Sequence, residues 1–402
     1  MHVLVLGAGV VGVTTAYYLA KLGYRITVVD SSERVADGAS HANAGQLSYS
    51  YTDSLARPTF FATLPGLILG KDLASTVRLD PALMTWGVRF LRQCTTRRAD
   101  ANTDALLQIA LRSAELMDDI LTDVPIEFAH RHAGKLVLLS GDRALEHAER
   151  TTRIKNRRGC DVRIISPEET LEIEPAIREM NSDFDAAVYS QDDDIGDSRL
   201  FVDGMRQYLE NNAEVKFRLG AEVDRLIMDK ASCVGAAVGA EELTADAVVV
   251  CLGAWSAKLM RQVGIHVPIY PVRGYSLTLP PGDRAPSVSV TSLKHKIVIG
   301  RINGNMRIAG FADFGGFDTS SDEPRTQQLL DLARSVAPDA ADYGQAYAQR
   351  WGGFRAMTPN GLPLSGATHI PKLYTNTGHG MLGFTLACAT ASTTAESIAR
   401  TH

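Results

Sequence analysis

The first thirty residues constrain the fold more than any other part of the chain. They have the order strand, glycine-rich turn, helix and second strand, which is the order of a dinucleotide-binding βαβ unit. The pattern predicts a strand at 2–6, a helix at 10–22 and a second strand at 25–29. The glycines of the turn have the spacing G-x-G-x-x-G and are Gly7, Gly9 and Gly12.

Each residue of this motif has a physical reason to be there. Gly7 permits a tight turn, Gly9 lets the backbone approach a pyrophosphate, and Gly12 lets helix and strand pack closely. The start of the helix offers free N–H groups and the positive end of its dipole. Asp30 is suited to accept hydrogen bonds from a ribose diol and would repel a 2′-phosphate. The sequence therefore predicts FAD or NAD rather than NADP; the alternative is a glycine-rich turn that binds no ligand.

Length and composition narrow the class of protein. The 402 residues suggest two domains, and the net charge of −5 gives no reason to expect nucleic acid as a partner. The five cysteines are scattered without a C-x-x-C pair, so we expect reduced thiols and no metal site. Because the dinucleotide motif begins at residue 2, we expect no signal peptide, and no apolar run has the length of a membrane span.

Two shorter stretches leave alternatives open. The apolar run 60–69 contains Pro65 and Gly66, and it is interpreted as a buried loop or as a patch that touches a membrane surface or an electron-acceptor partner. The acidic run 192–194 is interpreted as a solvated loop, because no histidine or further acid is spaced to complete a metal site.

The second half of the chain predicts a different kind of sheet. Alternating strands are expected at 275–279, 296–301 and 306–311, with a hairpin turn at Asn303-Gly304. We interpret this antiparallel block as the floor of a substrate domain. The tail then has the same strand–turn–helix order as the first thirty residues. A strand is expected at 373–376, followed by a glycine-rich turn that leads into a helix ending near Arg400. This second helix start suits a negatively charged ligand edge.

Five motifs in order give the whole chain a family resemblance. It resembles the small-subunit type of D-amino acid dehydrogenase, within the larger group that contains glycine oxidase and sarcosine oxidase. The motifs are at 5–14, 42–46, 272–278, 355–361 and 376–380.

The resemblance implies an α/β fold with non-covalently bound FAD. A Rossmann-like FAD-binding domain of the glutathione-reductase type would be interrupted by an antiparallel-sheet α+β substrate domain. The expected FAD-binding domain is discontinuous and comprises 1–50, 141–266 and 345–402. The expected substrate domain comprises 51–140 and 267–344.

The resemblance also implies which residues hold FAD. The turn after the first strand would bind the pyrophosphate, the end of the second strand the ribose, and the tail the pyrimidine edge of the flavin. The full expected set is Gly7, Gly9, Val10, Val11, Gly12, Asp30, Ser31, Ser40, Ala44, Gly45, Gln46, Leu47, Val223, Gly253, Trp255, Gly378, Gly380, Met381, Leu382, Gly383, Phe384 and Thr385.

The implied chemistry is hydride transfer from the Cα of an amino or imino acid to flavin N5, which leaves an imine. Negative charge would then collect at the flavin N1–C2=O edge, where a helix start at 383–385 would stabilise it. Arg355 is the expected anchor of the substrate carboxylate, since its planar fork matches a carboxylate and keeps its charge. The alternative is a structural salt bridge.

Three further residues are catalytic candidates. Tyr275 is expected to add a hydroxyl donor to the same carboxylate, or else to be a plain core-edge tyrosine. His379 and His41 are expected to position the amine or help keep it neutral, although His379 could instead hydrogen-bond backbone in its turn. Position 41 and the stretch 48–51 depart from the usual family pattern, which leaves room for a cyclic substrate such as a D-hydroxyproline.

Three functions follow from these expectations. The first is an FAD-dependent dehydrogenase of a small amino acid that passes electrons to a quinone or another carrier. The second is an oxidase that makes hydrogen peroxide, and the third is a non-catalytic FAD-holding subunit. The expected location is the cytoplasm, including the inner face of the cell membrane through peripheral contact.

Overall fold

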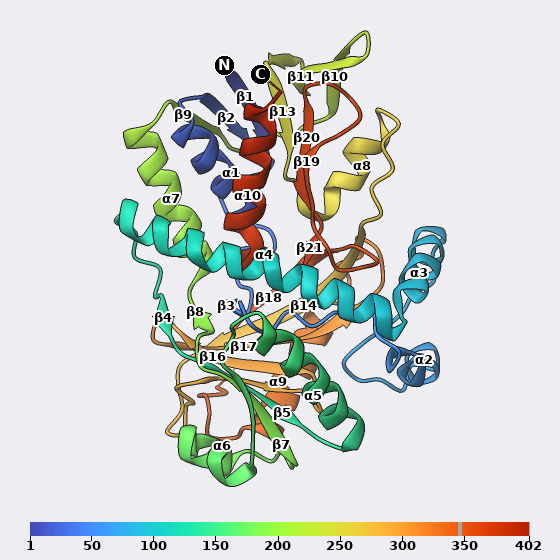
Figure 1. Ribbon diagram of the computed structural model, residues 1–402, viewed down its shortest axis with the longest axis vertical. Helices are drawn as coiled ribbons and strands as arrows, with labels where there is room; N and C mark the ends of the chain where they lie inside the picture. The colour runs from blue at the N-terminus through green and yellow to red at the C-terminus, as the bar shows by residue number, and fades with distance from the viewer. Residues whose placement is uncertain (345–347, 402) are drawn as a thin grey trace.

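Two β-sheets lie end to end and organise the chain (Figure 1). The computed structural model describes residues 1–344 and 348–401. The first sheet has six strands in the order β19-β20-β13-β1-β2-β9. Their bounds are β1 His2–Leu6, β2 Arg25–Val29, β9 Val215–Arg218, β13 Ala247–Val250, β19 Leu364–Ala367 and β20 Leu373–Thr377.

Strand β1 lies at the centre of this sheet, where its residues Val3 to Leu6 are apolar and fully buried. It pairs in parallel with β13 on one side and with β2 on the other. Four helices pack with one face into a shared hydrophobic core, namely α1 Val10–Lys21, α4 Thr96–Asp123, α7 Ser198–Asn212 and α10 Gly383–Ala399. A small antiparallel sheet and a short helix belong to a second core: β10 Arg225–Asp229, β11 Ser232–Val238, β12 Glu241–Thr244 and α8 Ser256–Arg261.

The second sheet has nine strands in the order β21-β18-β14-β17-β16-β15-β5-β7-β6. Its strands are β5 Lys135–Leu139, β6 Val162–Ile165, β7 Ala186–Ser190, β14 Tyr270–Leu279, β15 Ser289–Ser292, β16 Ile297–Ile302, β17 Asn305–Asp313, β18 Gln349–Met357 and β21 His379–Gly380. The predicted antiparallel block and the parallel sheet are thus both present.

Two strand pairings of this sheet cross the predicted domain boundaries, which stay predictions. Residues 141–190 were expected in the FAD-binding domain, but β7 pairs antiparallel with both β5 and β6. Strand β18 was also expected there, but it pairs with β14 along nine residues. The paired strands lie far apart in sequence, so local sequence patterns do not predict these pairings. The predicted boundary at 344/345 adjoins residues 345–347, which lie outside the described residues.

The remaining elements connect or cover the sheets. In Figure 1, helix α4 crosses the molecule between the two sheets, and α2 and α3 lie together at one end of it. The bounds are β3 Gln46–Leu47, α2 Phe60–Ile68, α3 Pro81–Gln93, α4 Thr96–Asp123, β4 Arg131–His132, α5 Asp142–Arg157, α6 Pro167–Ile173, β8 Asp194–Ile195 and α9 Asp322–Val336, with 3₁₀ turns at Pro175–Glu179 and Gly253–Trp255.

One of the two alternatives for the run 60–69 is wrong, and so is the interpretation of the acidic run. The run 60–69 is largely the surface helix α2 rather than a buried loop, and the Phe61 side chain is 49% exposed. The acidic run is not a solvated loop, because Asp193 and Asp194 are buried. Asp193 accepts hydrogen bonds from the Ser50 N–H and hydroxyl, and Asp194 contacts two histidines. A buried carboxylate needs such partners, and none of them is adjacent in sequence.

The predicted close packing at Gly12 is confirmed. A Cβ atom at Gly12 would overlap the carbonyl oxygen of Gly7, and one at Gly7 would overlap the carbonyl of Cys251. Gly7 also has a φ of 111°, which favours glycine. The helix start is therefore held against the end of β1 by backbone contacts that no side chain could replace.

We predict that Gly12→Ala destabilises the protein even without cofactor, by about 1–3 kcal/mol, because the methyl group has no room. Gly87→Ala in α3 is the matched control, since its Cβ would meet no atom within 4 Å. Urea unfolding of both variants without FAD measures the difference. Equal stability of the two variants would refute the packing argument.

Candidate active site

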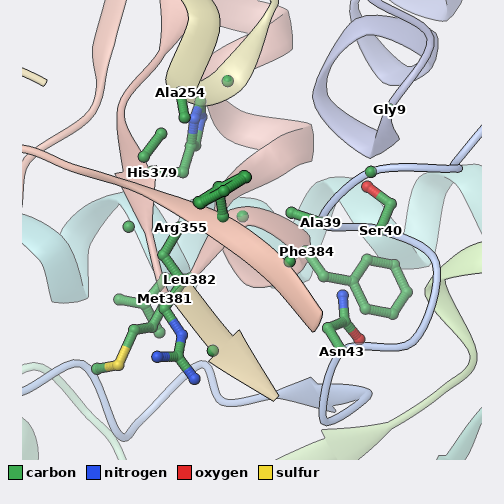
Figure 2. Close-up of a pocket in the computed structure, with 18 of the residues that line it drawn as sticks. Gly9, Ala39, Ser40, Asn43, Ala254, Arg355, His379, Met381, Leu382 and Phe384 are labelled. Carbon is green, nitrogen blue, oxygen red and sulfur yellow. The ribbon is translucent and has the colours of Figure 1, made fainter. Parts of the chain in front are cut away.

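One cavity of about 1080 Å³ runs between the two sheets. Its lining begins at the turn after β1, with Gly7 and Gly9, and reaches Arg355 and His379. Figure 2 shows Gly9 and Ser40 on one side of the view and Arg355 and Met381 on the other. The cavity is therefore built from segments that the sequence separates by more than three hundred residues.

The dinucleotide end of the cavity has the predicted turn. The Ser40 hydroxyl accepts a hydrogen bond from the Val10 N–H at 3.0 Å, and so caps the start of α1 from a distant loop. The carboxylate of Asp30 accepts from the N–H groups of Ala8 at 2.7 Å and Ser32 at 2.9 Å. These bonds fix the carboxylate at the end of β2, beside the turn, while each oxygen keeps a further lone pair for a ligand hydroxyl.

The residues of this end fit FAD. A Cβ at Gly9 would meet only the Ser40 hydroxyl, at 3.4 Å, so the face of Gly9 toward the cavity is open to a pyrophosphate. The cavity then continues past Ala44, Gln46 and Trp255 to the start of α10. A long cavity with a helix start at each end matches a dinucleotide that carries a flavin ring.

The start of α10 forms the second ligand-facing helix end. Among the described residues no side chain caps it, and its first residues Gly383, Phe384 and Thr385 line the cavity. The Thr385 hydroxyl accepts from the Ser48 N–H at 3.2 Å and donates to the Gln46 carbonyl at 3.4 Å. The positive end of this helix dipole is thereby fixed beside the 46–48 segment.

Three hydrogen bonds hold the loop that leads into this segment. The Ser276 hydroxyl donates to the Ala42 carbonyl, and Arg307 donates to the Asn43 carbonyl at 2.7 Å. The Ser198 hydroxyl donates to the Ser40 carbonyl at 2.7 Å. The nine-stranded sheet and α7 therefore position a loop whose own sequence has few groups to order it.

Arg355 reaches into the cavity from β18. Its guanidinium crosses β14, where a Cβ at Gly274 would overlap it, and donates to the Phe311 carbonyl on β17 at 2.7 Å. Burial lowers the pKa of Arg355 to about 10, which leaves it charged at neutral pH. Among the described residues no carboxylate oxygen lies within 4 Å of the guanidinium, so the predicted alternative of a structural salt bridge is wrong.

Tyr275 does not have the expected free hydroxyl. The ring is 1% exposed, and the hydroxyl donates to the Asp313 carboxylate at 2.8 Å. Asp313 also pairs with Arg325 through two hydrogen bonds of 2.8 Å. Because the single phenolic proton is used in this network, the geometry supports the core-edge alternative for Tyr275 rather than donation to a substrate.

The two histidines have different surroundings. His379 lines the cavity, and its Nε2 lies 2.9 Å from the Thr390 hydroxyl, which itself donates to helix carbonyls. With the Thr390 hydroxyl proton on the Leu386 carbonyl, Nε2 is the nitrogen that carries the imidazole proton. Burial lowers the pKa of His379 to about 3. His41 lies outside the cavity lining, with its Nδ1 3.8 Å from Asp37. The geometry therefore does not support a catalytic role for His41.

Most of the expected cofactor residues line the cavity, and two do not. Leu47 packs into the hydrophobic core, and Gly12 packs against Gly7. The expected residues that line the cavity are Gly7, Gly9, Val10, Val11, Asp30, Ser31, Ser40, Ala44, Gly45, Gln46, Val223, Gly253, Trp255, Gly378, Gly380, Met381, Leu382, Gly383, Phe384 and Thr385.

Sequence reasoning missed Lys135, which also lines the cavity. Its side chain is 4% exposed, and its ammonium donates to Gln46 and Ser48. The available signal was a single lysine in the otherwise apolar strand K-L-V-L-L. The sequence could not predict that this lysine contacts the 46–48 segment.

Comparisons with known proteins agree with this geometry. The family model described as FAD dependent oxidoreductase matches residues 2–397. The chain is 37% identical to "D-amino acid dehydrogenase 2" of Ralstonia nicotianae, over 100% of this chain and 97% of that protein. It is 36% identical to "D-amino acid dehydrogenase" of Vibrio cholerae, over 98% and 94%. The solved glycine oxidase of Geobacillus kaustophilus has a similar fold, with a TM-score of 0.77, 22% identity and coverage of 100% and 95%.

The surroundings of His379 predict a pH dependence of stability. Its pKa is 6.5 when unfolded and about 3 when folded, so within this window only the unfolded chain binds the proton. The free energy of unfolding therefore falls as pH falls below 6.5. Between pH 6.5 and 5 the wild type should lose up to about 2 kcal/mol more than His379→Gln, which cannot titrate. Urea unfolding at both pH values measures this, and identical losses would contradict it.

Proposed function

The chain belongs to the FAD-dependent oxidoreductase family, and from this membership we propose that it oxidises a small D-amino acid at the bond between Cα and nitrogen. It is an FAD-dependent oxidoreductase of the D-amino acid dehydrogenase-like kind, and the reaction class is oxidative deamination. Bound FAD supplies the acceptor for the hydrogen that leaves Cα with its electron pair. The product is an imine.

The observation that carries the proposal is the guanidinium of Arg355 in the same cavity as the two helix starts. We propose that it binds the substrate carboxylate, because it is charged, half-buried and has no carboxylate partner of its own among the described residues. Binding at that end orients the Cα–H bond. The main contribution of the protein to catalysis is therefore to position the substrate, and the reaction does not require a strong base.

Two further groups have proposed roles. The residues around the start of α10, with Gly378, Gly380 and Gly383, hold the pyrimidine edge of the flavin, where the helix dipole favours negative charge. His379 stays neutral because it is buried, and its Nδ1 is an acceptor suited to the substrate amine. Gly7, Gly9, Val10 and Asp30 hold the rest of FAD.

The substrate side chain and the electron acceptor are finer proposals. The names of the relatives favour a dehydrogenase, so we propose a quinone or another carrier as acceptor rather than oxygen. The departures at 48–51 keep a cyclic imino acid such as a D-hydroxyproline among the substrates to test. Oxygen-dependent release of hydrogen peroxide under air, faster than anaerobic reduction of a quinone dye, would favour the oxidase instead.

A surface on α2, α3 and the segment between them supports peripheral contact with the membrane that holds quinones. Large apolar side chains are exposed there, and they are Phe61, Leu69, Leu73, Met84 and Val88. Exposed Lys71, Arg89 and Arg92 lie in the same segments and suit anionic lipid headgroups. In the described parts of the chain, no helix combines the length and the hydropathy that a membrane crossing requires.

The function is tested by an anaerobic screen of D- and L-amino acids, including cyclic imino acids, for bleaching of the bound flavin. D-isomers should bleach it. Arg355→Ala should keep the yellow flavin and lose about 10²- to 10⁴-fold in kcat/KM, because bonds of about 1.5–3 kcal/mol each are removed. Arg350→Ala is the control, since Arg350 is on the same strand, exposed and bonded to Gln327. Undiminished turnover in Arg355→Ala would remove the proposed anchor.

The membrane proposal predicts that the wild type sediments with anionic lipid vesicles at low salt and less with neutral ones. The double variant Phe61→Asp/Leu69→Asp should stay in the supernatant while its turnover with a water-soluble dye is unchanged. Loss of sedimentation in the double variant supports the surface. Vesicle binding that survives both substitutions would place the contact elsewhere or reject it.

A further inference from the structure

A buried ammonium lines the cavity without a role in the proposed reaction. Lys135 opens β5, and its side chain is 4% exposed. Its Nζ donates to the Gln46 side-chain oxygen at 3.0 Å and to the Ser48 hydroxyl at 2.8 Å. Both acceptors are neutral. An ammonium has three N–H donors, so one remains for a further partner.

The charge of Lys135 is not matched by a direct ion pair. Among the described residues no carboxylate oxygen lies within 4 Å of its Nζ, whereas the second buried lysine, Lys155, pairs with Asp53 at 2.7 Å. The Tyr51 ring lies near both ammonium groups, at 4.4 Å and 4.6 Å from its centre. Asp193 is a nearby carboxylate that favours the charge of Lys135 without a direct ion pair; its Oδ1 accepts both hydrogen bonds of Ser50.

A buried charge with no carboxylate in direct contact is costly, so its persistence favours contact with an anionic ligand or loss of the proton. Burial lowers the pKa of Lys135 to about 8, which leaves the group mostly charged at pH 7. The rest of the strand, Leu136 to Leu139, is apolar and buried. Nothing in the strand itself therefore accounts for a lysine at this position.

Arg355 and Lys135 approach the cavity from different strands of the same sheet. Arg355 comes from β18 and reaches the Phe311 carbonyl on β17, whereas Lys135 comes from β5, with β16 and β15 between. Both line the one cavity, and neither has a carboxylate within 4 Å among the described residues. Two separate cationic groups suit a substrate with two carboxylates.

We propose that Lys135 binds a carboxylate on the substrate side chain, so that the enzyme prefers D-amino acids with an acidic side chain. This rests on the proposed function, in which Arg355 binds the α-carboxylate. Gln46 and Ser48 orient the ammonium, since their oxygens fix two of its three N–H groups. A carboxylate is favoured over a neutral side-chain acceptor because it also supplies the missing negative charge.

The test compares acids with amides of the same size. Anaerobic flavin reduction gives kcat/KM for D-aspartate against D-asparagine and for D-glutamate against D-glutamine. The wild type should favour the acid of at least one pair by about tenfold or more. Lys135→Met should lower that acid-to-amide ratio about 10- to 100-fold. Lys296→Met is the control, because this lysine also lines the cavity but is half exposed and pairs with Asp72.

The possible results separate the two proposals. If no D-amino acid reduces the flavin, the proposed function fails. If D-amino acids reduce it but the wild type uses amides as well as acids, or Lys135→Met leaves the ratio unchanged, only the role of Lys135 is overturned. The wild-type ratio decides the matter even if Lys135→Met does not retain FAD. An equal loss of the ratio in Lys296→Met would also overturn it, because the effect would then be general electrostatics.

Discussion

The contact between the start of α1 and the turn after β1 is the constraint on which the rest of the site depends. Gly12 rests on the carbonyl oxygen of Gly7, and no larger residue fits there. This contact points the helix start at the cavity, where the Ser40 hydroxyl meets the Val10 N–H. A dinucleotide bound at this helix start would extend along the 40–48 loop toward α10, so the position of the flavin ring follows from a backbone contact far from it.

The substrate end of the cavity depends on a different physical balance. Burial makes charge expensive, yet the lining includes Arg355 and Lys135 without direct carboxylate partners among the described residues. The pKa of each is lowered, to about 10 and about 8, and both groups remain mainly charged at neutral pH. Neutral oxygens from Phe311, Gln46 and Ser48 hold them in place. Such groups are prepared for an anionic ligand and reorganise little when it arrives.

The sequence was enough to predict the parts of the fold that rest on local spacing. The glycine turn, the apolar β1 and the helix after Gly383 are local patterns, and the structure has all three. Local patterns do not reveal the pairing of β7, because both of its partners, β5 and β6, lie well before it in the chain. The free hydroxyl expected of Tyr275 and the missed Lys135 have the same cause. Their partners, Asp313 and the 46–48 segment, lie far away in sequence.

The central claim is that one cavity binds both FAD and a D-amino acid, with the substrate carboxylate on Arg355. A crystal structure tests this claim most directly. The FAD-loaded protein would be grown anaerobically and soaked with the D-amino acid that bleaches its flavin best. We expect the α-carboxylate within hydrogen-bond distance of the Arg355 guanidinium, and Cα over the flavin. A substrate carboxylate bound to other groups, with Arg355 still bonded only to Phe311, would contradict this arrangement.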